Sequence, residues 1–131
     1  MMQWQLSRHA ESLRTWVNLH YPHRDKRSDG SIGDARHAAR ESDHNPDPIT
    51  GTVRAIDIDA DLIPDTKDNT EAHRLADTIR AWGKSGERPI AYVIFHERIA
   101  SPRKNWAWRP YTGTNPHYCH IHVSFKKAKG E

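Results

Sequence analysis

The chain of 131 residues has little cysteine and no long apolar run. Its single cysteine, Cys119, cannot form an intramolecular disulfide, which argues against a disulfide-stapled secreted scaffold and favours synthesis in a reducing cytosol. Residues 1–6 lack the basic start and apolar stretch of a secretory signal, and no window resembles a membrane span. We therefore expect a protein made in the cytoplasm without a signal peptide and without a membrane partner.

Hydrophobic residues are also scarce, at 35% of the chain, although five Trp and four Tyr supply large side chains for a small core. The length suits one hydrophobic core and is too short for two. We therefore expect residues 1–131 to form a single domain and a monomer. The net charge of +3 suits a polyanionic partner and does not distinguish cell wall from nucleic acid.

Hydrophobic periodicity predicts two amphipathic helices. The first spans about 7–20, where apolar residues recur at steps of three and four and Ser7 is a suitable N-cap. The second spans about 69–82, with Gly83 as its C-terminal stop. Between them, a short Ala-rich helix is expected over 34–40.

Three segments rich in β-branched residues predict strands: 52–59, the apolar run 90–95 as a central strand, and 119–125. Cys119 alternates away from His120 and is expected in the core, whereas residues 126–131 are expected to fray. Segregated helices and strands indicate an α+β fold. A small antiparallel sheet would carry the functional site on one face and pack against the helices with the other.

Two pairs of polar residues share strand faces. His120 and His122 are two residues apart, so both imidazoles point to one side, and Asp57 and Asp59 repeat this geometry on another strand. His44 lies in a proline-rich loop that cannot be helical. Two His and one carboxylate are the ligand set of a catalytic Zn²⁺ with an open position for water. A His-x-His pair alone is weak evidence, because ten histidines produce close pairs by chance.

Three short motifs resemble those of the LAS metallopeptidases, namely Ser-x-His, Gly-x-Ala-x-Asp and His-x-His. The matching segments are Ser42 to His44, Gly51 to Asp57, and His120 to His122. That superfamily includes the D-Ala-D-Ala carboxypeptidases and L-Ala-D-Glu endopeptidases of the M15 family and the hedgehog signalling domains. The resemblance implies a hedgehog or D-Ala-D-Ala peptidase-like fold and a Zn²⁺ ion held by His44, Asp57 and His122.

A second likeness extends over roughly residues 10–125 and is carried by 24–34, 42–47 and 108–113. These segments resemble small M15-like endolysin proteins of phages and prophages. The likeness implies a peptidoglycan peptidase that cuts an amide in the stem peptide or cross-link, with no nucleic-acid partner. Without a signal peptide, such an enzyme would reach the wall through a holin or as part of a virion. The sequence does not choose between endopeptidase and carboxypeptidase.

Two departures from the family pattern affect these expectations. Twelve residues separate His44 from Asp57, where the family usually has about six, so 45–50 is expected to be an inserted loop on the rim of the site. Many M15 enzymes also have a Glu shortly before the last zinc ligand, whereas 115–119 contains no carboxylate. The resemblance then makes His120 the general base, as in related LAS enzymes.

The implied mechanism is amide hydrolysis, in which the metal polarises the carbonyl and a water loses its proton to His120. Arg40 and Arg54 are the candidate cations for stabilising the oxyanion. His117 is expected either to contact the catalytic residues without binding the metal itself, or to contact the substrate.

Several of these residues also have a plainer interpretation. His44 fits a loop histidine that caps a turn. Asp59 is the main alternative to Asp57 as a metal ligand. We favour Asp57 because the Ala-x-Asp motif matches there. Asp59 is then expected either to be exposed to solvent or to lie behind the ligands. Three aromatic residues suit a core and a sugar-stacking surface equally: Trp106, Trp108 and Tyr111.

Two other functions remain open. Asp43 to Asn45 superficially resembles the His and Asn of HNH nucleases, although the matching downstream helix with a second ligand is missing. A zinc-binding module without catalysis, as in hedgehog domains, is the other alternative because the usual Glu is absent.

Overall fold

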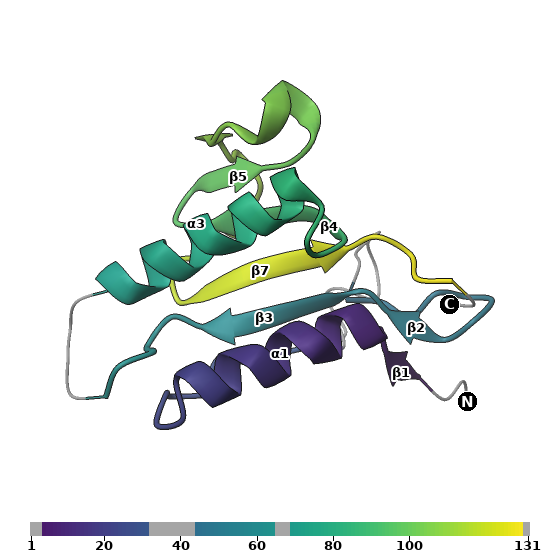
Figure 1. The fold of residues 1–131 in the computed structure, drawn as a ribbon, viewed down its shortest axis with the longest axis horizontal. Coiled ribbons are helices and arrows are strands. Elements are labelled where there is room, and N and C mark those ends of the chain that lie inside the picture. Colours follow the sequence, from purple (N-terminus) through teal and green to yellow (C-terminus); the bar gives the residue numbers. More distant parts are fainter. Residues whose placement is uncertain (1–3, 32–43, 65–68, 130–131) are drawn as a thin grey trace.

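The computed structural model describes residues 4–31, 44–64 and 69–129. A five-stranded antiparallel sheet has two helices against one face (Figure 1), an arrangement compatible with an α+β fold. The elements are β1 (Gln5–Leu6), α1 (Arg8–His20), β2 (Thr52–Val53), β3 (Ala55–Asp59), α3 (Thr70–Ser85), β4 (Ile90–Phe95), β5 (Arg98–Ala100), the 3-10 helix η1 (Arg103–Trp106), β6 (Arg109–Pro110) and β7 (His120–Phe125). No helix in these residues is long and apolar enough to cross a membrane.

The sheet has the strand order β3-β7-β4-β5-β6, and β1 and β2 form a separate short parallel pair. Both β3 and β4 pair antiparallel with β7, so they run in the same direction and α3 connects them across the inserted strand. The predicted central strand 90–95 is confirmed as β4, the third of five. The C-terminal strand β7 therefore lies directly beside β3.

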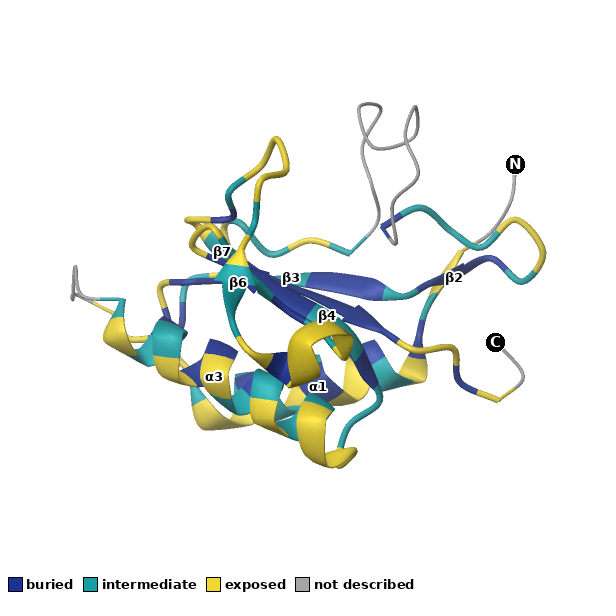
Figure 2. Ribbon diagram, turned by 90° about the horizontal axis from the view of Figure 1, so that it is seen from above, coloured by how far each residue is buried: buried dark blue, intermediate teal, exposed yellow. Residues whose placement is uncertain are grey.

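The two helices pack on the same side of the sheet (Figure 2). The buried stripe of α1 is Ala10, Leu13 and Val17, and that of α3 is Ala72, Leu75, Ala76 and Ile79. They share one hydrophobic core with alternate residues of the strands: Ile56, Ile58, Val93, Phe95, Ile121 and Val123. Because side chains alternate along a strand, the intervening residues of β3 and β7 project from the opposite face.

The predicted N-cap of α1 is confirmed, whereas the predicted C-terminal stop of α3 is wrong. Ser7 caps α1 as predicted, and its Oγ accepts the amide N–H of His9 at 3.3 Å. Gly83 does not end α3, which continues to Ser85 and stops at Gly86 with φ 83°. A Cβ at Gly83 would lie 2.5 Å from the ring of Trp106, so this glycine makes room for packing between α3 and η1.

Two further predictions are wrong. Cys119 is exposed because it precedes β7 in a loop, where its carbonyl accepts the amide N–H of Ala60. The tail is not frayed in its described part, since Ala128 is 4% exposed and the carbonyl of Lys129 accepts a bond from Arg8. The short helix predicted over 34–40 lies outside the described residues.

The aromatic residues after β5 divide between core and surface. Trp106 is buried in the core. Trp108 is half-buried: the guanidinium of Arg98 lies 4.7 Å from its ring, and its indole N–H donates to Asp77. Trp106 is therefore a core residue, and Trp108 is held by charged neighbours at the surface.

Candidate metal centre

The register of β3 and β7 brings two polar pairs together on the sheet face away from the helices. Asp57 lies directly opposite His122, and Asp59 lies opposite His120. Directly opposed residues in an antiparallel pair have neighbouring side chains on the same face. As this register predicts, Nδ1 of His122 lies 3.1 Å from Oδ1 of Asp57.

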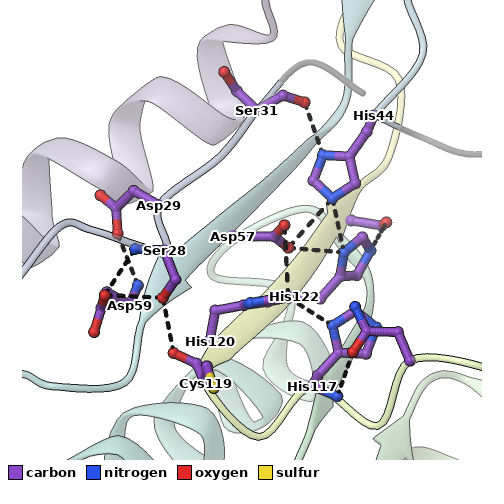
Figure 3. Close-up of polar contacts among 12 residues, drawn as sticks. Ser28, Asp29, Ser31, His44, Asp57, Asp59, His117, Cys119, His120 and His122 are labelled. Carbon is purple, nitrogen blue, oxygen red and sulfur yellow. Dashed lines mark hydrogen bonds and ion pairs between the residues drawn. The ribbon is translucent and has the colours of Figure 1, made fainter. Parts of the chain in front are cut away.

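His44 completes the group from the loop before β2 (Figure 3). Its Nε2 lies 3.2 Å from Oδ1 of Asp57 and 3.1 Å from Nδ1 of His122. Both imidazoles are almost fully buried, with His44 4% and His122 5% exposed. The structure thus brings together the three residues predicted as metal ligands, from a loop and two adjacent strands.

The spacing of these three atoms suits a metal ion. A tetrahedral Zn²⁺ with bonds of about 2.0–2.1 Å has ligand atoms about 3.3 Å apart. The three distances here are 3.1, 3.1 and 3.2 Å. Two imidazole nitrogens and one carboxylate oxygen are also a donor set that zinc accepts. The group can therefore hold a metal ion.

Each imidazole is oriented by a contact at its other nitrogen. The backbone carbonyl of Ser31 lies 2.7 Å from Nδ1 of His44, and because a carbonyl only accepts, Nδ1 carries the proton. This leaves the lone pair of Nε2 directed at the group. Nε2 of His122 lies 2.9 Å from the hydroxyl of Ser124. Such outer contacts fix ring orientation and tautomer in metal sites.

Two more histidines adjoin the group. Nε2 of His120 is 3.6 Å from Oδ2 of Asp57 and 2.9 Å from Nδ1 of His117. His117 is buried, and its backbone has φ 60°, an uncommon conformation for a residue other than glycine. Asn115 accepts the amide N–H of His117, and the carbonyl of His117 accepts that of His96. These bonds hold the strained backbone that directs His117 toward His120.

The electrostatics favour neutral rings at His117 and His120 beside an ionised Asp57. Burial, with help from His122 and His120, lowers the pKa of His117 to about 3, and burial also lowers the pKa of His120. Burial would raise the pKa of Asp57, but its close contacts with His122 and His44 outweigh burial and hold that pKa well below its ordinary value. Ionised carboxylate and neutral imidazole are the protonation states that bind a metal.

Asp59 does not belong to this group, and of the two expectations for it, exposure to solvent is wrong, whereas a place behind the ligands agrees with its contacts. It is buried, and its Oδ2 accepts the amide N–H and the hydroxyl of Ser28, each at 2.8 Å. The buried Arg24 donates to both carboxylate oxygens of Asp29 in the same loop, at 2.8 and 2.7 Å. This loop continues to Gly30, which is bridged to Asp57. Asp59 therefore helps to fix the segment that presents the Ser31 carbonyl to His44.

Of the two candidate cations, Arg54 belongs to the described part of the chain. Arg40 lies outside the described residues. Nη1 of Arg54 is 2.9 Å from Oδ2 of Asp47, in the segment 45–50 that was predicted as a rim loop. The ion pair with Asp47 therefore engages Nη1 of this guanidinium.

Sequence reasoning missed the residues that support the ligands. Ser31 acts through a backbone carbonyl, which no side-chain motif indicates. Ser124 was detectable in principle, because it lies two residues after His122 on the same strand face. The roles of Arg24 and Asp29 depend on a loop conformation that spacing does not predict.

Comparison with known proteins gives no relative for this chain. No protein-family model, curated protein or solved structure matches it. The resemblance to LAS metallopeptidases therefore stays a hypothesis based on short motifs, and the geometry of the metal centre carries the functional argument.

Proposed function

We propose that the protein is a zinc-dependent peptidoglycan peptidase of endolysin type, which hydrolyses an amide in the stem peptide or cross-link of the bacterial cell wall. The observation that carries this proposal is the convergence of His44, Asp57 and His122 at ligand-atom distances of 3.1–3.2 Å. An antiparallel sheet with ligands from a loop and two adjacent strands also supports the proposed hedgehog or D-Ala-D-Ala peptidase-like fold.

His44, Asp57 and His122 would hold the ion, and zinc supplies a Lewis acid that polarises a carbonyl and lowers the pKa of water. Their contacts to the Ser31 carbonyl and the Ser124 hydroxyl keep both imidazoles oriented for this purpose. Because these contacts already exist between protein groups, little reorganisation is needed when the ion binds.

His120 is the proposed general base. Its ring shares the site face of β7 with His122, and its Nε2 is 3.6 Å from Oδ2 of Asp57. Burial lowers its pKa, which keeps it neutral and able to accept a proton near pH 7. After it accepts the proton, His120 is a cation whose charge the Asp57 carboxylate stabilises, and Nδ1 of His117 lies 2.9 Å from its Nε2.

The wall substrate is proposed from two observations of unequal weight. The motif likeness to small phage proteins points to peptidoglycan, and the net charge of +3 suits an anionic polymer. The protein would act at the cell wall after release through a holin or as part of a virion.

The test is digestion of purified sacculi by the zinc-loaded protein, with new amino termini identified by mass spectrometry. Zinc-dependent amino termini, lost in His122→Ala, would support the proposal. New reducing sugar ends, or zinc bound without any product, would contradict it, and the latter result would favour a zinc-binding module without catalysis. Cleavage of DNA in a parallel assay would favour the nuclease alternative.

A further inference from the structure

We infer that Asp57, His117 and His120 form a second divalent-cation site, which shares the Asp57 carboxylate with the first. The three side chains each offer a ligand atom, and these atoms lie within 4.8 Å of one another. The site would lie beside the first on the same sheet face, and Figure 3 shows the two pairs of imidazoles around one carboxylate.

The two oxygens of Asp57 face different histidines: Oδ1 faces His44 and His122, and Oδ2 faces His120, which contacts His117. Oδ1 is 3.2 Å from Nε2 of His44 and 3.1 Å from Nδ1 of His122. Oδ2 is 3.6 Å from Nε2 of His120, which in turn is 2.9 Å from Nδ1 of His117. One carboxylate with a separate imidazole pair at each oxygen is an arrangement that can bridge two ions, and paired metals in proteins lie about 3.5–4 Å apart.

The second imidazole pair is built into the fold. His120 is fixed by the register of β7 against β3, directly opposite Asp59. His117 is 8% exposed and is held at φ 60° by two backbone bonds, its amide to Asn115 and its carbonyl from His96. Backbone strain of this kind persists only where surrounding contacts fix it. Both rings are thus held in position on the Asp57 side of the sheet.

The donor chemistry selects the class of ion. Two imidazoles and one carboxylate suit Zn²⁺ and other late first-row divalent ions rather than Ca²⁺ or Mg²⁺, which prefer oxygen ligands. The second site should be the weaker of the two, because one carboxylate charge is shared and the two cations repel each other. Its distances of 2.9 and 3.6 Å are also less even than the 3.1–3.2 Å of the first group.

A consequence for activity rests on the proposed function. An ion held by His120 would occupy the lone pair with which that residue accepts a proton. The first equivalent of zinc would therefore support hydrolysis, and excess zinc would inhibit it. The binding itself can be measured without any activity, so failure of the second site is distinguishable from failure of the peptidase proposal.

The experiment is a titration of the metal-free full chain with Zn²⁺. Binding is measured by calorimetry and by competition with a chromophoric chelator. Wild type should bind two equivalents, the second more weakly by at least about tenfold. His117→Ala should bind one equivalent with the affinity of the tight site retained. Titration with Co²⁺ gives a second measurement, because a shared carboxylate couples the two spins and lowers the electron paramagnetic resonance signal per ion.

His23→Ala is the matched control, since this exposed histidine lies outside the cluster and its removal should leave two equivalents. Circular dichroism establishes that each variant is folded. Saturation of wild type at one equivalent would overturn the inference, as would two equivalents in folded His117→Ala. Two bound Co²⁺ ions without spin coupling would overturn the inference that the two sites share the Asp57 carboxylate.

Discussion

Asp57 and His122 face each other directly across the β3–β7 pair, with Nδ1 of His122 3.1 Å from Oδ1 of Asp57. A shift of the register by one residue would turn one of the two side chains toward the helices, because side chains alternate between the faces of a strand. The apolar residues Ile56, Ile121 and Val123, which are buried against the helices, prevent such a shift. The hydrophobic core thus sets the geometry of the metal centre.

Replacement of His120 separates metal binding from catalysis. We expect His120→Ala to retain the tightly bound zinc and to lower turnover by roughly a hundredfold or more, the usual scale for losing a positioned proton acceptor. The measurement is kcat on sacculi beside zinc content. Activity near that of wild type would show that another residue is the general base, and His117 would be the next residue to test.

Ser124 tests the contact behind His122. Its hydroxyl lies 2.9 Å from Nε2 of His122 and is fully buried. Ser124→Ala should weaken zinc affinity by about 10–100-fold, because the ring loses the partner that orients it. Ser124→Thr retains a hydroxyl and should recover part of the affinity. Equal zinc affinity in wild type and Ser124→Ala would remove this role.

Gly83 is predicted to serve packing rather than helix termination. A Cβ there would approach the Trp106 ring to 2.5 Å, so Gly83→Ala should lower the free energy of unfolding by about 1–3 kcal/mol despite the better helix propensity of Ala. The neighbouring exposed residue Lys84 gives the control, because Lys84→Ala should change stability little. Urea denaturation measures both. A gain in stability for Gly83→Ala would show that the ring moves aside freely.

The hydrogen bonds that Asp47 accepts, first from the Ile49 amide and then from Arg54, predict a pH dependence of stability. The amide N–H of Ile49, followed by Arg54, lowers the pKa of Asp47 from 3.8 to about 2. A carboxyl whose pKa is depressed by folding stabilises the protein above its unfolded pKa, and this contribution is lost as pH falls from 3.8 through about 2. The stability difference between wild type and Asp47→Asn should therefore shrink over this range. A difference that does not depend on pH would contradict the assignment.

The sequence predicts the local structure better than it predicts contacts between distant segments. Apolar periodicity gives both helices, and alternation gives the shared faces of Asp57 with Asp59 and of His120 with His122. Strand pairing is non-local, so sequence spacing alone could not predict that β7 inserts between β3 and β4.

The errors have the same physical origin. Gly83 matches a helix stop by residue type, but tertiary packing against Trp106 decides its role. Exposure to solvent was one expectation for Asp59, but Ser28 in the neighbouring loop donates two hydrogen bonds to its buried carboxylate. The contact of His117 with His120 agrees with its expected place beside the catalytic residues, but its geometry depends on a backbone with φ 60°, which no hydrophobic pattern indicates.

The central claim is that His44, Asp57 and His122 hold one tightly bound zinc ion. Elemental analysis after gel filtration without added metal tests it most directly, on wild type and on single Ala variants of the three residues. The account predicts one zinc per wild-type chain and loss of zinc in each folded variant, because each contributes one of three ligand atoms. Stoichiometric zinc in folded His122→Ala, or none in wild type reconstituted with zinc, would contradict it.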